Sequence, residues 1–279
     1  MGSIGTNVQS LVAQRIFGQN TQGLHQSLMK LSTGLRINRG SDDPAGLIAS
    51  ENLRATLSAL EAETRALERT DHVVRSADAA LDEVSGLINR AEELAIANAN
   101  TGALSDAERE ANQLEMDSIV QSVHRIAHSA GFNGSDLLDG SLSLQGGGSS
   151  IDVASASPSD IGEVMDGSES YTFADLASGG GLSLSSGDPE VVSEVIRQAR
   201  MDVAFSRGSL GSFSAFTLQP SIRSNQDAFV QTASAESMIR DTDYAFESSN
   251  LVRHQILSAS SLSVLADANR QPGVVIGLL

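Results

Sequence analysis

LSTGLRINRGSDDPAGLI, from Leu31 to Ile48, is the stretch where one helical pattern ends and a longer one begins. Before the break, leucines recur at spacings of four and three, which is the apolar seam of a helix that packs on another helix. The turn-forming run NRGS at 38–41 interrupts that pattern, and Asp43 followed by Pro44 predicts an N-cap with proline at the first helical position. The predicted seam consists of Leu24, Leu28, Leu31 and Leu35. The stretch therefore predicts a hinge between two helices.

A single long helix is predicted to run from Pro44 to about Asn100. Its apolar residues recur at every seventh position, and a second stripe lies one residue away in the second half. Sustained heptads favour a coiled-coil bundle, and the doubled stripe indicates that the second half contacts more than one neighbour. The first stripe is Leu53, Leu60, Leu67, Val74, Leu81, Ile88 and Ala95, and the second is Val73, Ala77, Ala80, Val84, Leu87, Ala91 and Leu94.

Two further bundle helices have start signals of their own. Ser105 and Glu108 form a capping box for a helix that ends near Gly131, and Asp188–Pro189 repeats the cap with proline. Between these helices the chain is rich in Gly and Ser with short apolar pieces, which favours hairpin strands and loops. We therefore expect a mainly α protein, an elongated coiled-coil helical bundle with paired N- and C-terminal helices and a small β-hairpin-rich subdomain.

Two prolines are predicted to interrupt the helices of the last third. An interior proline removes a hydrogen bond and costs about 3 kcal/mol, so Pro220 predicts a kink or break between Thr217 and Ser221. Pro272 followed by Gly273 predicts the end of the last amphipathic helix.

The composition excludes several classes of function. A net charge of −17 without basic clusters argues against a nucleic-acid partner. The absence of cysteine excludes disulfides and thiol chemistry, and no run of about 18 apolar residues predicts a membrane span. We also expect no Sec signal, since no basic region followed by an apolar run opens the sequence.

Residues that could support catalysis or metal binding do not form a recognisable set. His124 and His128 have the spacing of two ligands on one helix face, but they lack a glutamate between them and a third ligand, so we interpret them as helix-surface residues. Asn133 lies in a glycosylation-type tripeptide that we interpret as a turn. We expect no enzymatic activity, no cofactor and no metal.

Both ends of the chain resemble one family. The stretch Leu31–Ile48 resembles, almost letter for letter, the N-terminal signature of bacterial flagellins, the subunits of the flagellar filament. Near the other end, Ala235–Tyr244 (AESMIRDTDY) and Leu265–Leu279 (LADANRQPGVVIGLL) resemble flagellin C-terminal sequence. Two alternatives stay open: the related hook–filament junction protein, which shares the N-terminal signature, and a soluble coiled-coil scaffold.

The resemblance implies a structural subunit that polymerises with copies of itself for swimming motility. It implies export through the flagellar type III channel to the extracellular flagellum, with flagellar cap, junction and export-chaperone proteins as partners. From the composition we expect no membrane or nucleic-acid partner. The expected domains are 1–43 with 236–279 as a terminal coiled coil, 44–140 with 188–235 as a helical bundle, and 141–187 as a small projection of hairpins or loops.

One surface is similar to the flagellin segment that an animal flagellin-sensing Toll-like receptor recognises. It is LINRAEELA, from Leu87 to Ala95, in which Arg90, Glu93 and Leu94 stand at the matching positions, with Glu115 on the following helix. Glu92 is acidic where sensed members tend to be basic. The alternative interpretation is an ordinary bundle helix with Leu94 in the core and Arg90 in solvent.

The charges of the two ends predict how they pair. Met1 to Ser41 contains no acidic residue, whereas the start of the C-terminal segment is mainly acidic. If the terminal helices pair antiparallel, Arg36 and Arg39 come level with Asp241 and Asp243, and we expect ion pairs between them. The apolar residues expected to pack the C-terminal helix include Leu251, Ile256, Leu262 and Leu265. Because little of the terminal surface is apolar, we expect both ends to be disordered in the free monomer.

Overall fold

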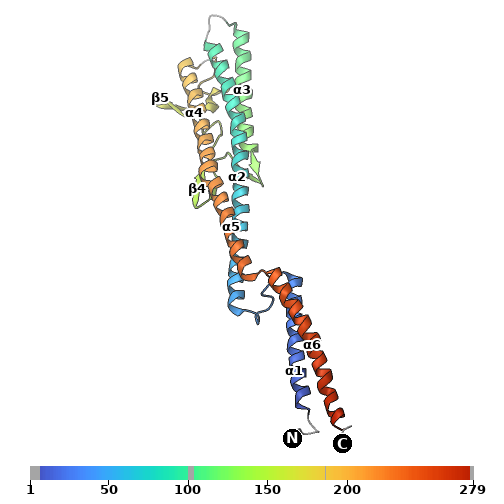
Figure 1. Ribbon diagram of the computed structural model, residues 1–279. Helices are drawn as coiled ribbons and strands as arrows, with labels where there is room; N and C mark the ends of the chain where they lie inside the picture. Colours follow the sequence, from blue (N-terminus) through green and yellow to red (C-terminus); the bar gives the residue numbers. More distant parts are fainter. Residues whose placement is uncertain (1–6, 100–103, 186, 277–279) are drawn as a thin grey trace. The chain divides into compact units, whose positions relative to one another are not determined.

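The structure is a computed structural model that describes residues 7–99, 104–185 and 187–276. Long helices dominate it and the strands occur only in short hairpins, so the expected mainly α fold class is confirmed (Figure 1). The chain divides into two compact units, one formed by Met1–Leu60 with Ala228–Leu279 and the other by Glu61–Asp227.

The longest helix, α2 (Pro44–Ala99), matches the predicted range. It begins where the sequence predicts because the Asp43 carboxylate accepts a hydrogen bond from the Gly46 N–H at 2.9 Å. The turn before it is closed by Asp42, whose Oδ2 accepts from the N–H groups of Asn38 and Arg39 at 3.1 and 2.9 Å. The hinge predicted by the sequence is therefore built by two neighbouring aspartates.

In the unit Glu61–Asp227, the second half of α2 packs with α3 (Asp106–Ser129) and α4 (Pro189–Phe213) around one core. Both predicted stripes of α2 supply this core, as expected for a helix with more than one neighbour. The start signals also hold, because Ser105 and Glu108 form the capping box and Asp188 caps α4 through the Glu190 N–H. The buried residues of the stripes include Leu67, Val74, Ala77, Leu81, Val84, Ile88, Ala91, Leu94 and Ala95.

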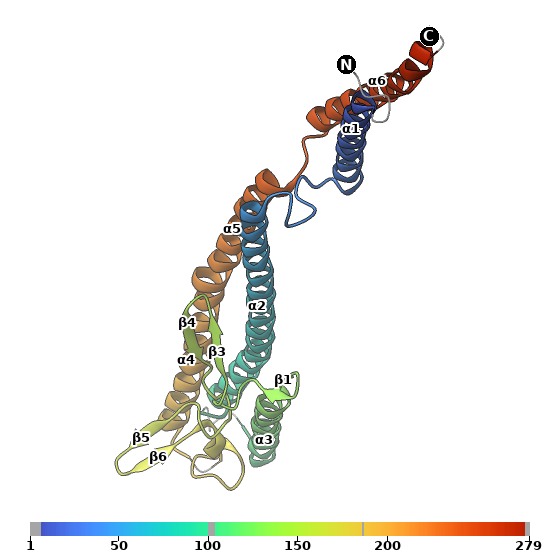
Figure 2. The ribbon, with the colours of Figure 1, turned by 90° about the horizontal axis from the view of Figure 1, so that it is seen from below.

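Three antiparallel hairpins lie between α3 and α4 in the sequence, as the Gly- and Ser-rich composition predicts (Figure 2). Their apolar residues, with those of the 3-10 turn η1 (Phe173–Leu176), belong to the same core as the helices, so the segment is anchored in the bundle. The hairpins are β1 (Gly131–Phe132) with β2 (Ser135–Asp136), β3 (Ser143–Gly146) with β4 (Ser149–Asp152), and β5 (Val164–Asp166) with β6 (Glu169–Tyr171).

Of the kink or break predicted at Pro220, the break is wrong, because the helix continues through the proline. A π-helical turn, η2 (Ser214–Leu218), follows α4, and α5 (Gln219–Arg240) continues directly from it. In this wider turn the Gln219 N–H donates to the Ser214 carbonyl, five residues back. The π-type hydrogen bond lets the helix continue through Pro220. Asp71 of α2 supports this turn, since its carboxylate accepts from Ser214 Oγ at 2.6 Å and from Gln219 Nε2 at 3.2 Å.

The last helix also continues where the sequence predicts an end. Helix α6 (Tyr244–Ile276) runs through Pro272 and Gly273. The first helix, α1 (Val8–Thr33), ends at Gly34, whose φ of 75° is a left-handed conformation that glycine adopts without strain. Helices α1 and α6 belong to the unit that contains both ends of the chain.

Candidate assembly interface

Helices α1 and α6 lie side by side and run antiparallel (Figure 1). On each helix the least exposed residues recur at alternating spacings of three and four, which is the pattern of a coiled coil. We call these residues the terminal seam. On α1 they are Ser10, Ala13, Phe17, Asn20, Leu24, Ser27 and Leu31, and on α6 they are Glu247, Leu251, His254, Ser258, Ser261, Leu265 and Ala268. Most of the seam is therefore small or polar.

The predicted leucine seam is only partly correct. Leu24 and Leu31 lie on the terminal seam, as do Leu251 and Leu265 of α6, all half-buried. The other predicted residues do not: Leu28, Ile256 and Leu262 are 45%, 64% and 53% exposed, and Leu35 lies beyond the end of α1. Ser27 occupies the buried position expected for Leu28 because small side chains let the two helices approach closely.

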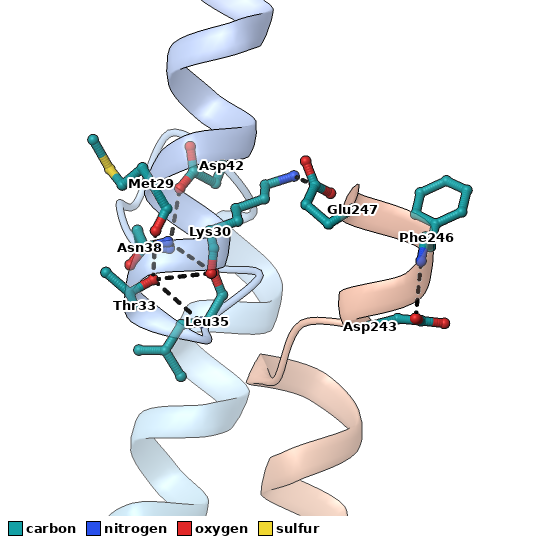
Figure 3. A network of polar contacts seen from close by, with 9 residues as sticks. All are labelled: Met29, Lys30, Thr33, Leu35, Asn38, Asp42, Asp243, Phe246 and Glu247. Atoms are coloured by element: carbon teal, nitrogen blue, oxygen red, sulfur yellow. Dashed lines mark hydrogen bonds and ion pairs between the residues drawn. The ribbon is translucent and has the colours of Figure 1, made fainter. Parts of the chain in front are cut away.

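Polar contacts fix the alignment of the seam. Asn20 Nδ2 donates to the Leu257 carbonyl at 3.3 Å and to Ser261 Oγ at 3.4 Å. Nearer the hinge, Lys30 Nζ lies 3.8 Å from Glu247 Oε2, and Glu247 is buried (Figure 3). These contacts give the pair of helices a defined register.

At the hinge, the two connecting segments cross and form a short antiparallel bridge. Leu35 lies opposite Asp241, the Arg36 N–H donates to the Arg240 carbonyl at 2.6 Å, and the Thr242 N–H donates to the Gly34 carbonyl at 2.9 Å. Residues 34–36 thus lie opposite residues 240–242, so the two segments meet where the charge pattern predicts.

The predicted ion pairs are wrong, however, since none joins Arg36 or Arg39 to Asp241 or Asp243, four residues that the structure describes. The Arg36 guanidinium donates to the Ile239 carbonyl at 2.6 Å, in the last turn of α5.

The two aspartates have other partners. Asp241 accepts from Ser237 Oγ at 2.6 Å. Asp243 caps α6 by accepting from the N–H groups of Ala245 and Phe246, and Figure 3 shows the contact with Phe246. Carboxylates at a helix terminus satisfy local N–H groups first, which a count of charges does not reveal. Arg240 does form an ion pair in this region, with its Nη1 2.8 Å from Glu51 Oε1. The hydrogen bond that it donates lowers the pKa of Glu51.

The surface that resembles the receptor-recognised segment is polar. Arg90 Nε lies 2.7 Å from Glu115 Oε1 and Arg90 Nη1 lies 2.8 Å from Glu93 Oε2, and the hydrogen bond that Arg90 donates to Glu115 is the main cause of a raised Arg90 pKa. Leu94 is only 4% exposed and belongs to the core, as the alternative interpretation of an ordinary bundle helix predicts. Glu92 pairs with Arg200 of α4.

No metal-binding cluster and no helix able to cross a bilayer occur in the described ranges. His124 and His128 lie exposed on α3 with ring centroids 4.2 Å apart, as the helix-surface interpretation predicts.

The chain matches two family models, the bacterial flagellin N-terminal helical region over residues 4–143 and the C-terminal helical region over residues 193–279. It belongs to the bacterial flagellin family. Similar proteins include the flagellar filament 30.7 kDa core protein of Treponema maltophilum, at 31% identity over 99% of both chains, and a flagellin of Bacillus subtilis, at 30% identity over 99% of both. This flagellin is therefore a structural subunit of the bacterial flagellar filament.

Proposed function

We propose that this flagellin polymerises through its terminal segments, 1–43 and 236–279, which become fully ordered only among neighbouring subunits. In this proposal the paired ends line the inner filament, the bundle of 44–140 and 188–235 forms the outer wall, and 141–187 projects from it. The observation that carries the proposal is the distribution of side chains on α1 and α6. Most residues of the terminal seam are small or polar, whereas many large apolar residues of α1 and α6 are exposed and point away from it.

The outward apolar residues support self-assembly as the way in which this surface is covered. Burial of apolar area contributes about 25 cal/mol per Å² removed from water, and a seam in which most residues are small or polar supplies only part of it. The free energy that orders the ends must therefore come from the outer faces, where a second copy of the chain offers the same apolar residues. These include Leu11, Val12, Ile16, Leu28, Val252, Ile256, Leu262 and Val264.

We also propose the partners that follow from the family. An export chaperone would cover the apolar outer faces before export through the flagellar type III channel, and cap and junction proteins would contact the same ends in the extracellular flagellum. For the animal Toll-like receptor, the candidate surface is reduced to Arg90, Glu93 and Glu115, since Leu94 is buried.

The test is seeded polymerisation of the purified full chain, followed by electron microscopy. We expect long filaments for the wild type and none for Ile256→Ser, while the neighbouring control Gln255→Ser assembles normally. Circular dichroism should give the same helical content for both unassembled variants. Soluble oligomers of fixed size in place of filaments would favour the coiled-coil scaffold, and normal assembly of Ile256→Ser would contradict a role for the outer face.

A further inference from the structure

A proline inside α6 leaves one backbone carbonyl without its usual partner. In an α-helix each carbonyl accepts from the N–H four residues later. Pro272 has no N–H, and α6 is helical through it, so the Ala268 carbonyl lacks that donor. Ala268 is only 6% exposed and lies on the terminal seam, where an unsatisfied carbonyl would be costly.

Asn7, just before the start of α1, supplies the missing donor. Its Nδ2 donates to the Ala268 carbonyl at 2.7 Å, while its Oδ1 accepts from the Ser10 N–H at 3.0 Å and so caps α1. Beside it, Ser10 Oγ donates to Asn269 Oδ1 at 2.7 Å. One side chain thus begins α1 and completes the hydrogen bonding of α6.

We propose that Asn7 is a positioning residue for filament assembly, which sets the register of α1 against α6 by recognising the carbonyl that Pro272 leaves free. Serine, threonine and aspartate also cap helices, but an ionised aspartate has no donor and a hydroxyl must accept and donate at one oxygen, whereas the amide offers its oxygen to α1 and a separate N–H donor to α6. If α1 shifted along α6, Asn7 would face a carbonyl already bonded within the helix. A seam made mostly of small and polar residues would tolerate several alignments of α1 against α6. The free Ala268 carbonyl favours the one alignment in which Asn7 reaches it.

This inference rests on the proposed function, because it assumes that paired ends support polymerisation. Its test is a double-mutant cycle on the full chain with Asn7→Ser, which keeps a capping oxygen, Pro272→Ala, which restores an N–H to the Ala268 carbonyl, and the double variant. The control is Gln14→Ser, which removes an exposed amide from α1. The measured quantity is the critical concentration, read as residual monomer after seeded filaments are sedimented.

We expect Asn7→Ser to raise the critical concentration about 5-fold in the native background, because it leaves a buried carbonyl unsatisfied. In the Pro272→Ala background, Asn7→Ser should alter the critical concentration less than about 2-fold. Gln14→Ser should leave the critical concentration unchanged. An equal fold-change in both backgrounds would overturn the proposal.

A failure of the proposed function gives a different result, namely a wild-type chain that forms no filaments. The same variants are then compared by their thermal unfolding midpoints, where Asn7→Ser should lower the midpoint more with Pro272 than with alanine at that position. Additive shifts would overturn the role of Asn7 in that case as well.

Discussion

Gly23 of α1 faces the imidazole ring of His254 of α6 so closely that a β-carbon on the glycine would lie 2.5 Å from Cε1. Real β-carbons do not approach another atom so closely, so the ring must move if any side chain is added. His254 belongs to the terminal seam and Gly23 precedes the seam residue Leu24, so the pair is a close contact between the two helices and gives the first prediction.

Gly23→Ala should raise the critical concentration for polymerisation, although alanine favours a helix by about 1 kcal/mol over glycine. The reason is that the new methyl group displaces His254 and separates the two helices. Sedimentation of seeded filaments measures the effect. Gly18→Ala is the control, because Gly18 is exposed on the same helix and its added methyl group meets nothing within 4 Å.

Removal of the ring should relieve the effect. In the double variant Gly23→Ala with His254→Ala, the critical concentration should be lower than the product of the two single fold-changes predicts. A double variant that follows the product would mean that the defect of Gly23→Ala does not arise from this contact.

A second prediction concerns the hinge. Arg36→Glu should impair assembly, because the guanidinium donates to the Ile239 carbonyl and the new carboxylate would repel it. Adding Asp241→Arg and Asp243→Arg should worsen the defect, since Asp243 caps α6 and the loss of a cap costs about 1 kcal/mol. Negative-stain microscopy at moderate salt checks both variants. Rescue by the triple variant would restore the hypothesis of direct ion pairs.

Arg39→Glu is the matched control for Arg36→Glu. The Arg39 side chain is exposed, and the contribution of this residue to the turn is its backbone N–H, which donates to Asp42. Filaments should form normally from this variant.

The third prediction concerns Asp71 and acid. Burial opposes ionisation of its carboxyl group, but hydrogen bonds from Ser214, Arg75 and Gln219 together with the charge of Arg75 outweigh it and lower the pKa below the ordinary 3.8. A lowered pKa means that the carboxylate stabilises the fold above that pH and that this contribution is lost as the pH falls through the folded-state value. Asp71→Asn should therefore show a smaller loss of stability than the wild type on acidification.

Denaturant unfolding between about pH 5 and pH 2 tests this difference. At neutral pH, Asp71→Ala should lower the free energy of unfolding by about 1–3 kcal/mol, because Ser214 and Gln219 lose their acceptor. Glu61→Gln is the control, since its carboxylate is 59% exposed and pairs only with the neighbouring Arg65. An equal acid slope in the wild type and Asp71→Asn would contradict the prediction.

The fourth prediction is that the fragment Glu61–Asp227 folds alone. The main hydrophobic core lies wholly within this unit, so the fragment should be helical and unfold cooperatively. In the fragment, Leu81→Ala should cost about 2–5 kcal/mol, because Leu81 is 1% exposed, whereas Ile96→Ala, at a 65% exposed position of the same helix, should cost little. Chemical denaturation monitored by circular dichroism measures both, and a fragment without a cooperative transition would refute the prediction.

Local signals in the sequence predict much of the fold. The caps at Asp43, Ser105 and Asp188 depend on residues within one turn, and the heptads of α2 depend on a periodicity that large apolar residues carry. Each of these features is decided by near neighbours in the chain, so it can be inferred without a structure.

The candidate interface is harder to infer because its residues are small and their partners are distant. Ser27 and Ser261 are buried on the seam while Leu28 and Leu262, one position further along, point outward, so apolar positions alone do not mark the contact. The predictions at Pro220 and Pro272 also fail because the groups that keep the helix intact are distant in the sequence. At Pro220 the helix is maintained by a π-turn that Asp71 supports, and at Pro272 the free carbonyl is satisfied from the other end of the chain.

The small polar seam has a consequence for how filaments begin. A seam made mostly of small and polar residues contributes little free energy to ordering the two ends of a free subunit, so in the proposed assembly those ends are ordered mainly by contacts with neighbouring subunits. An incoming subunit at an existing end meets several apolar surfaces at once, and the gain from burial exceeds the cost of ordering its ends. From the proposed assembly we therefore expect growth at an existing end to be faster than spontaneous nucleation.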